Sequence, residues 1–492
     1  MALNTLTSLK KLLDKKEISC IELTHECLKN AKSSPLNAFI TITENEALES
    51  AKTQQQLSEN SALNSPLAGI PIAHKDIFCT KGILTSCASK ILENFISPYD
   101  ATVVSKLNDA GSISIGKTNL DEFAMGSSNE SSFYGAVDNP WNTDFVPGGS
   151  SGGSAVAVAA GIVPFATGTD TGGSVRQPAA YCNLTGLKPT YGRCSRYGMI
   201  AYASSLDQAG IFTHTAEDAA IALNAMSGFD EKDSTSLNIA NENFSKDLNN
   251  TLDELTIGIP EQFFTSELNP EVADLIQQAI KEYEKMGATI KDISLPNSPQ
   301  ALPAYYIIAP AEASSNLSRF DGVRYGFRAE HYEDLNDMYT KTRSQGFGPE
   351  VQKRIMIGAY ALSSGYYDAY YAKAQKLRRL ITNDYLEAFK DCDVVLGPTT
   401  PEPAFKKGST ADPVSMYLND MFTVTANLSG LPAISIPAGF TKTGLPVGMQ
   451  LTAPHLQEAK LLNVAHQYQL ATDHHNKTPA NYHSLTSIGG QS

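Results

Sequence analysis

The 492-residue sequence contains no long apolar run. A helix that spans a membrane needs about 20 consecutive, mostly apolar residues, and no segment approaches that length. The N-terminus, MALNTLTSLKKLLDKK, also lacks the continuous apolar core of a secretory signal. The sequence therefore predicts a cytoplasmic protein with no membrane contact.

Paired cysteines and excess basic charge are missing as well. The seven cysteines are an odd number and are scattered without the close pairs of a metal-binding motif, so we expect neither a disulfide nor a metal site. The 38 basic residues are outnumbered by 52 acidic ones, which gives a net charge of −14. This balance argues against a nucleic acid held mainly by this chain through phosphate contacts.

No low-complexity linker or internal repeat divides the chain. We expect one large α/β domain over residues 1–492, with a mixed central β-sheet covered on both sides by helices. Residues 1–60 predict a helical N-terminal region, in which Ser19 and Glu22 form a capping box, and the catalytic core is expected at about residues 65–455. Apolar strands that alternate with helical patterns such as 270–287 and 363–390 are expected at 70–78, 112–117, 162–168, 255–260, 393–398 and 433–439.

Residues 147–178, PGGSSGGSAVAVAAGIVPFATGTDTGGSVRQP, contain two glycine-flanked serine clusters. The second cluster follows a short apolar stretch and precedes a helical pattern, which places Ser174 at a strand-to-helix turn. Glycines let the backbone approach a ligand closely, so the N–H groups of Thr171, Gly172, Gly173 and Ser174 can form an oxyanion hole. Ser174 is the predicted nucleophile.

A serine hydroxyl needs a neighbouring base, and neither cluster contains a histidine. His74 and Lys75 end the apolar segment that begins at residue 67. A lysine that is buried there loses the hydration of its charged form, its pKa falls, and its neutral amine can accept a proton. Lys75 is therefore the predicted base, and Ser150 of the first cluster is the predicted proton relay between Lys75 and Ser174.

This lysine–serine–serine set resembles the catalytic triad of the amidase signature family. Ser150 lies 24 residues before Ser174, and Lys75 lies 99 residues before it, which are the separations that carry the match. The resemblance implies the amidase signature fold and a cis peptide bond before Ser150. It also implies the same roles of base, relay and nucleophile for the three residues.

Within that family the sequence is similar to the glutaminase subunits of tRNA-dependent amidotransferases, with matching runs at 116–130, 136–142, 176–198, 312–326 and 427–437. The resemblance implies that glutamine is hydrolysed to glutamate and ammonia, and that a partner subunit uses the ammonia to amidate Glu-tRNA(Gln), Asp-tRNA(Asn) or both. It further implies a heterotrimer with two other subunits, and we expect the tRNA to be bound mainly through a partner subunit. No cofactor is expected in this chain, whereas the assembled complex would use ATP and magnesium.

Glutamine carries an α-ammonium and an α-carboxylate, and both need partners when they leave water. By resemblance, Asp420 would bind the ammonium, Arg354 would bind the carboxylate, and Tyr305 would form a wall of the pocket. Tyr306 is equally well placed in the sequence for that last role. Each of the two charged residues also has an ordinary interpretation as part of a solvated helix face.

Two short motifs point elsewhere. Residues 111–118, GSISIGKT, match the Walker A pattern of phosphate-binding loops. A helical pattern precedes Gly111 and the SISI segment alternates like a strand, so Gly111 is better explained as a helix C-cap. Residues 148–152 match the nucleophile elbow of esterases, but a polar, proline-broken segment precedes them where an elbow needs an apolar strand.

Two further alternatives remain open from the sequence alone. A free-standing hydrolase of other amides would have the same serine and lysine residues. Alternatively, both glycine–serine clusters are flexible loops and Lys75 is a solvated surface residue, as such residues usually are. The presence of two clusters, each of which begins a helical pattern, favours the catalytic interpretation.

Overall fold

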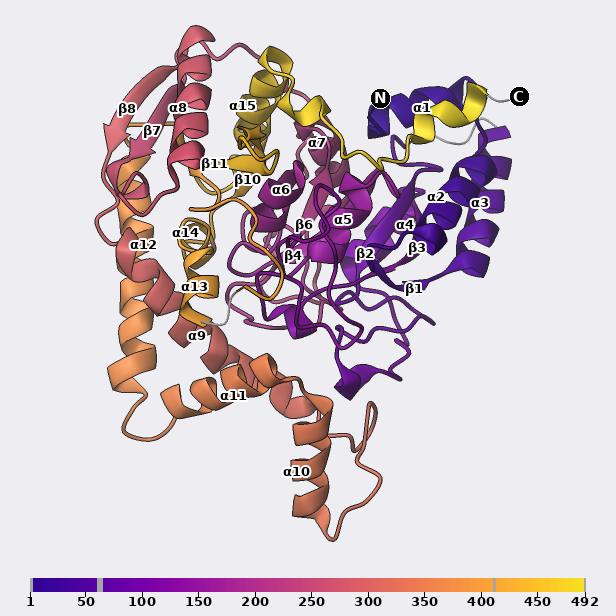
Figure 1. Cartoon of the computed structure of the whole chain (residues 1–492), viewed down its shortest axis with the longest axis vertical. Coiled ribbons are helices and arrows are strands. Elements are labelled where there is room, and N and C mark those ends of the chain that lie inside the picture. The colour runs from indigo at the N-terminus through magenta and orange to yellow at the C-terminus, as the bar shows by residue number, and fades with distance from the viewer. Residues whose placement is uncertain (1–2, 60–64, 410–412, 491–492) are drawn as a thin grey trace.

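A computed structural model describes residues 3–59, 65–409 and 413–490. In these ranges the chain forms one α/β domain around an 11-stranded mixed sheet (Figure 1). The strands are β1 Phe39–Ile42, β2 Pro71–Lys75, β3 Ile113–Thr118, β4 Phe165–Asp170, β5 Thr185–Lys188, β6 Gln208–Thr213, β7 Thr256–Pro260, β8 Thr289–Ile293, β9 Val394–Pro398, β10 Ala433–Phe440 and β11 Pro446–Thr452. Their order across the sheet is β1-β3-β2-β4-β6-β5-β10-β11-β9-β7-β8. All six strands expected from the sequence are present.

Parallel and antiparallel pairs occur in separate blocks of the sheet. Strand β2 is parallel to both β3 and β4, and β7 is parallel to both β8 and β9. The strands between these blocks pair antiparallel, from β4 through β6, β5, β10 and β11 to β9. Every residue of β2, β4, β5, β6, β9 and β11 is buried, as expected for strands that are covered on both faces.

Helices cover both faces of the sheet, as predicted. An added Cβ at Gly186 of β5 would come within 2.5 Å of the Ala179 side chain in α6, whereas the neighbouring Thr185 side chain is bonded to Gln469 of α15. Because successive side chains of a strand point to opposite faces, α6 and α15 lie on opposite sides. The α-helices of the described residues are α1 Leu6–Asp14, α2 Cys20–Ser33, α3 Glu44–Glu59, α4 Thr102–Asp109, α5 Gly152–Ala159, α6 Arg176–Cys182, α7 Ala216–Met226, α8 Pro270–Lys285, α9 Ala301–Asn316, α10 Leu335–Gly346, α11 Pro349–Ala361, α12 Lys373–Ala388, α13 Pro413–Leu418, α14 Val424–Leu428 and α15 Glu458–Ala471.

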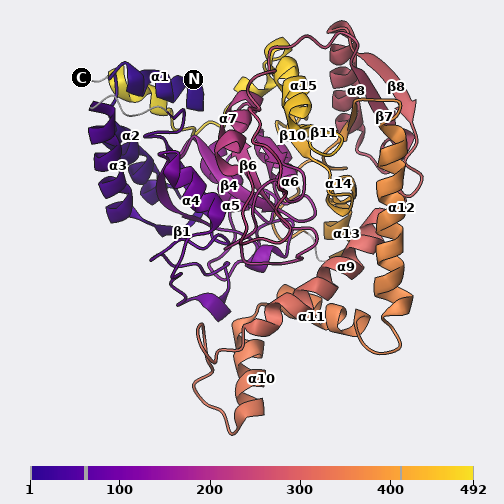
Figure 2. The same cartoon turned by 180° about the vertical axis from the view of Figure 1, so that it is seen from behind.

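The N-terminal region is helical with one exception. Helices α1, α2 and α3 form where expected, and Ser19 caps α2 with the reciprocal contacts of Glu22. Strand β1 interrupts them and pairs antiparallel with β3, so this region adds an edge strand to the sheet. The two ends of the chain lie close together, because the Asn4 side chain bonds to the backbone of His483 and Leu485 (Figures 1 and 2).

Helix α10 projects from the main body at one end of the molecule (Figures 1 and 2). The helix expected at 363–390 is divided in the structure into a π-helical segment, Asp368–Ala372, and α12. All seven cysteines are buried free thiols. Among the helices of the described residues, none is long and apolar enough to cross a membrane.

The Walker A match does not form a phosphate-binding loop. Its lysine, Lys117, lies within β3, and its Nζ is 3.0 Å from the carboxylate of Asp76 with both side chains fully buried. The same amine also donates to the Phe78 carbonyl at 2.8 Å and to Thr85 at 3.0 Å. Gly111 follows α4 with a φ of +87°, as a C-terminal glycine does. This lysine is therefore part of the core.

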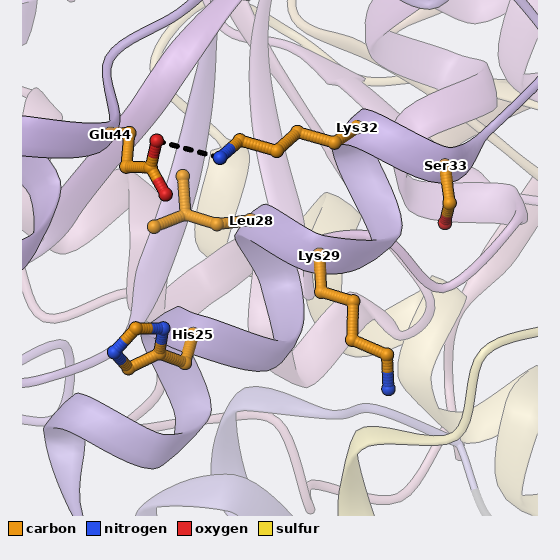
Figure 3. Close-up of a pocket in the computed structure, with 6 residues that line it drawn as sticks. All are labelled: His25, Leu28, Lys29, Lys32, Ser33 and Glu44. Carbon is orange, nitrogen blue, oxygen red and sulfur yellow. Dashed lines mark ion pairs between the residues drawn. The ribbon is translucent and has the colours of Figure 1, made fainter.

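A surface ion pair gives a useful contrast with Lys117. Lys32 of α2 and Glu44 of α3 are 2.6 Å apart, and both are about half exposed. They line a shallow surface pocket of about 350 Å³ together with His25 and Lys29 (Figure 3). Exposed pairs of this kind contribute about 0–1 kcal/mol, whereas breaking a buried pair costs about 3–5 kcal/mol, because a buried charge is left unpaired.

We therefore expect Lys117→Ala to lower the free energy of unfolding by about 3–5 kcal/mol, and Lys32→Ala to lower it by less than about 1 kcal/mol. Urea denaturation of the two variants measures both values. Mg-ATP should not raise the melting temperature of the unmodified protein. Equal destabilisation by the two substitutions, or protection by Mg-ATP that Lys117→Ala removes, would contradict the structural role assigned to Lys117.

Candidate active site

The Lys75 amine is buried among hydroxyl groups. Lys75 is the last residue of β2 and is fully buried, and its Nζ lies 2.8 Å from the hydroxyl oxygens of Ser150, Ser151 and Thr169. Burial lowers the pKa of Lys75 to about 7, although nearby carboxylates partly oppose this shift. The amine is therefore neutral in a large fraction of molecules near pH 7, which a proton acceptor requires.

The three hydroxyls around Lys75 are not equivalent. The Ser151 hydroxyl donates its proton to the Thr169 carbonyl at 3.2 Å, so it is available to the amine only as an acceptor. The hydroxyls of Ser150 and Thr169 have no other acceptor among the described residues. Either of these two can therefore donate to a neutral Lys75, and Ser150 belongs to the loop whose next residue, Ser151, is bonded to the backbone of the predicted nucleophile.

The loop that carries Ser150 is fixed on both sides. The Gly149–Ser150 peptide bond is cis, which confirms the expectation drawn from the family resemblance. Gly149 N–H donates to the Gln177 side chain at 2.9 Å, and the Ser150 carbonyl accepts from the Asp121 N–H at 3.1 Å. These bonds place the Ser150 side chain against Lys75.

Ser174 lies between β4 and α6, so the predicted strand-to-helix turn is confirmed. Its carbonyl accepts a bond from the Ser151 N–H at 3.3 Å, which joins the two serine clusters directly. Ser174 is 8% exposed, whereas Lys75 and Ser150 are completely buried. The predicted nucleophile is thus the member of the set that a substrate can reach.

The backbone before Ser174 presents fewer free donors than predicted. The N–H of Gly173 donates to the Asp170 carboxylate at 2.9 Å, which corrects its assignment as an oxyanion donor. The N–H groups of Thr171, Gly172 and Ser174 donate to no acceptor among the described residues. These three groups remain available to an oxyanion, and Gly173, with a φ of +134° and Thr423 against its Cα, serves the shape of the turn.

A buried ion pair supports this turn. Asp170, the last residue of β4, is 2.9 Å from Arg176 of α6, and both side chains are fully buried. Burial alone would raise the pKa of Asp170, but Arg176 and the Asn427 amide more than offset it and hold that pKa well below its usual range. No sequence pattern indicated this pair.

Asp420 is buried close to the same turn. It accepts hydrogen bonds from Ser127 at 2.9 Å and from the Tyr306 hydroxyl at 3.1 Å, and burial raises its pKa to about 7. The Thr423 hydroxyl is within bonding distance of both the Asp420 carbonyl, at 3.0 Å, and the Gly172 carbonyl, at 2.6 Å. Thr423 therefore connects the Asp420 segment to the backbone beside Ser174.

Arg354 of α11 is 3% exposed and only partly paired. Its Nε donates to Glu350 at 2.8 Å and its Nη1 donates to the Tyr202 hydroxyl at 2.8 Å. Its Nη2 is buried and has no hydrogen-bond partner among the described residues. A buried guanidinium nitrogen without an acceptor is costly, so this nitrogen is suited to an anionic group of a ligand.

Both candidate tyrosines lie in the site. Tyr305 packs so closely on Gly172 that a Cβ there would come within 2.6 Å of the tyrosine hydroxyl, whereas Tyr306 donates to Asp420 and stacks on Tyr417 with ring centroids 4.0 Å apart. The Arg354 guanidinium lies over the Tyr306 ring at 5.6 Å. The two residues thus contact different parts of one site.

Several residues of the site were not predicted from the sequence. Ser151 and Thr169 could have been flagged, because they flank the predicted relay and the Asp-Thr-Gly-Gly-Ser turn. Ser127 lies within one of the runs that carried the family resemblance. Nothing in the sequence around Tyr202 indicates that its hydroxyl meets Arg354.

A buried lysine, two serines on adjacent loops and free backbone N–H groups are the kinds of group that an amide hydrolase needs. A sequence model of the amidase family matches residues 22–462, and the chain belongs to this family. Over 481 residues it is 60% identical to a glutamyl-tRNA(Gln) amidotransferase subunit of Pseudomonas fluorescens, covering 97% of this chain and 99% of that protein. The same subunit of Pseudomonas syringae pv. tomato is 60% identical over 484 residues, with 97% and 99% covered.

Solved structures agree with this assignment. The crystal structure of the corresponding glutamyl-tRNA(Gln) amidotransferase subunit from Thermotoga maritima is 41% identical, has a TM-score of 0.78, and covers 94% of this chain and 93% of its own. The peptide amidase of Stenotrophomonas maltophilia is 28% identical, has a TM-score of 0.81, and covers 97% and 98%. The fold is therefore shared with both an amidotransferase subunit and a peptide amidase.

The pKa of Lys75 predicts the pH dependence of the reaction. Below about pH 7 the amine is protonated and cannot accept a proton, so kcat/KM should fall with falling pH and level off above about 7. A simple uncharged amide is the substrate to use, because it avoids any contribution from Asp420. The same inflection is expected in Asp420→Asn, and a profile that is flat across neutral pH would exclude Lys75 as the base.

The identity of the nucleophile can be tested by trapping. A glutamine-derived electrophile should add one adduct to the unmodified chain, and peptide mass spectrometry should place it on Ser174. We expect Ser174→Ala to abolish adduct and turnover, and Lys75→Ala and Ser150→Ala each to reduce turnover by several orders of magnitude, because members of a catalytic unit act together. A normal adduct on Ser174→Ala would assign the attack to another residue.

Proposed function

We propose that this chain is the glutaminase subunit of a tRNA-dependent amidotransferase. The observation that carries the proposal is the pair of opposite charges beside the nucleophile turn, with Asp420 bonded to Ser127 and Tyr306 and with Arg354 retaining an unpartnered Nη2 among the described residues. An α-amino acid has one ammonium and one carboxylate to satisfy such a pair. The 60% identity to a glutamyl-tRNA(Gln) amidotransferase subunit, over 97% of this chain, supports the assignment to an amidotransferase.

The first half of the reaction forms an ester. Neutral Lys75 accepts a proton from Ser150, which in turn accepts the proton of Ser174, and the Ser174 oxygen then bonds to the side-chain amide carbon of glutamine. The negative charge that develops on the amide oxygen is stabilised by the N–H groups of Thr171, Gly172 and Ser174. Lys75 returns its proton through Ser150 to the amide nitrogen, the C–N bond breaks, and ammonia leaves.

The second half of the reaction releases glutamate. Water loses a proton through Ser150 to Lys75 and bonds to the ester carbon. The Ser174 oxygen then leaves, and it recovers the proton from Lys75 through Ser150. The enzyme returns to its starting protonation state, and no metal ion or cofactor bound to this chain takes part in the proposal.

The fate of the ammonia involves other chains. We infer that it is used in a partner subunit to amidate Glu-tRNA(Gln), Asp-tRNA(Asn) or both, in a heterotrimer with two other amidotransferase subunits. ATP and magnesium would be used by that assembly to activate the carboxylate. The net charge of −14 suits an arrangement in which another subunit binds most of the tRNA, and the cytoplasm is the compartment for such a reaction.

A free-standing amide hydrolase is the second candidate. The TM-score of 0.81 with a peptide amidase favours it, because the same fold supports hydrolysis without partners. The two candidates differ in the substrate they select. A free-standing enzyme would prefer other amides, and its rate would not depend on added subunits.

Ammonia release from glutamine separates the two candidates. The isolated chain is expected to hydrolyse glutamine weakly, and the rate should rise when the partner subunits and an aminoacyl-tRNA are added. Ammonia is measured by a coupled assay with glutamine and a simple primary amide compared at equal concentration. Fast turnover of the simple amide by the isolated chain, with no effect of partners, would favour the free-standing hydrolase.

Asp420→Asn tests the substrate assignment within the same assay. Removing the carboxylate charge should raise the KM for glutamine by about tenfold or more, because a charge-assisted hydrogen bond is lost, and should affect a simple amide much less. Asp14→Asn, at the exposed end of α1, is the matched control and should match the unmodified protein. Equal losses for both substrates in Asp420→Asn would argue against the ammonium-binding role.

A further inference from the structure

Asp207 is a buried carboxylate between two parts of the site. It is 3% exposed and directly precedes β6. The Thr171 hydroxyl donates to its Oδ1 at 2.7 Å, and the Tyr202 N–H donates to its Oδ2 at 2.9 Å. The Ala203 N–H lies 3.1 Å from both oxygens. Both oxygens of this carboxylate therefore act as acceptors.

The two sides of Asp207 lead to different functional groups. Thr171 contributes one of the free N–H groups of the oxyanion turn. Tyr202 accepts the Nη1–H of Arg354 on its hydroxyl at 2.8 Å, and its ring lies 5.7 Å from the guanidinium carbon. The Tyr202 carbonyl is also held, by the Asn316 side chain at 3.1 Å. A displacement of Asp207 therefore reaches both the oxyanion turn and Arg354.

We propose that Asp207 is a positioning residue that links the oxyanion turn to the arginine of the substrate pocket. It touches neither the substrate nor the reacting atoms. It sets the position of the Thr171 N–H through the Thr171 side chain, and the direction of the Arg354 Nη2 through Tyr202. Rate and substrate selection then depend on one carboxylate, and for glutamine this inference rests on the proposed function.

The chemistry of the donors explains why a carboxylate is needed here. Three separate donor groups converge on two oxygens, and an ionised carboxylate presents acceptors only. Burial raises the pKa of Asp207 to about 6, which leaves it mostly ionised at neutral pH. Asparagine has nearly the same shape but replaces one oxygen with an NH₂ group, which would face either Thr171 or Tyr202 as a second donor.

The test compares kcat and KM for glutamine and for a simple primary amide that has no α-carboxylate. Asp207→Asn should lower kcat for both substrates by about tenfold or more and also raise the KM for glutamine several-fold. Tyr202→Phe keeps the ring and removes the hydroxyl, so it should raise the KM for glutamine by about tenfold, with a much smaller change for the simple amide. Circular dichroism and melting temperature check the fold of each variant.

Asp230→Asn is the matched control, because the Asp230 carboxylate also accepts two hydroxyl donors, Ser195 and Thr102, but contacts no residue of the site. Its kinetics should match those of the unmodified protein. An Asp207→Asn variant that folds and lowers kcat but keeps the glutamine KM of the unmodified protein would overturn the link to Arg354. Unchanged kcat would overturn the link to the oxyanion turn.

If Asp207→Asn does not fold, Thr171→Val decides the question. This change removes a donor on the side of Asp207 away from Arg354, so the link predicts a higher glutamine KM in addition to a lower kcat. An unchanged KM would overturn the proposal. These outcomes differ from a failure of the proposed function, which would appear as an unmodified protein that releases no ammonia from glutamine.

Discussion

A neutral lysine amine inside the protein is the constraint around which this molecule is organised. Hydration favours the charged form, and burial away from water lowers the pKa of Lys75 to about 7. Strand β2 places the residue between β3 and β4, where every position from 71 to 75 is buried. Three hydroxyls then satisfy the amine without adding charge. A carboxylate in place of any one of them would raise the pKa of Lys75 and keep the amine protonated.

The carboxylates around Lys75 raise its pKa only partly, because their oxygens are bonded elsewhere. Asp121, Asp170 and Asp207 all favour the protonated form of Lys75, yet each accepts hydrogen bonds from other donors. Asp170 pairs with Arg176, and Asp207 accepts from Thr171 and two backbone N–H groups. Both carboxylates therefore act mainly on the shape of the turn before Ser174. These acidic groups stabilise the loop, and their attraction to the amine is too weak to offset burial. The pKa of Lys75 therefore stays at about 7.

Sequence patterns predicted much of this arrangement, for identifiable reasons. Apolar runs located the strands expected at 70–78, 112–117 and 162–168, and the glycine–serine clusters located both loops, because close backbone approach requires glycine. Edge strand β8 was not predicted, since most of its residues are exposed and polar. Contacts between distant segments were not predicted either, because no local sequence pattern encodes them. Arg354, for example, donates to the Tyr202 hydroxyl although the two residues are 152 positions apart. The hydrogen bond from the Gly173 N–H to the Asp170 carboxylate was not predicted for a similar reason, because it depends on the orientation of one side chain.

The site separates a reacting end without net charge from a recognition end with two opposite charges. In the proposed reaction Lys75, Ser150 and Ser174 exchange protons without a fixed ion, whereas Asp420 and Arg354 are ionisable groups that the fold buries. Burial raises the pKa of Asp420 to about 7 despite the hydrogen bonds from Ser127 and Tyr306, so the protein alone holds this carboxylate at the limit of ionisation. An ammonium group would restore its charge, and a carboxylate would complete the shell of the Arg354 Nη2. A ligand with both groups thus relieves two desolvation costs at once, and an amide with neither relieves none. Under the proposed function, this difference is the source of the binding free energy that favours glutamine over simple amides.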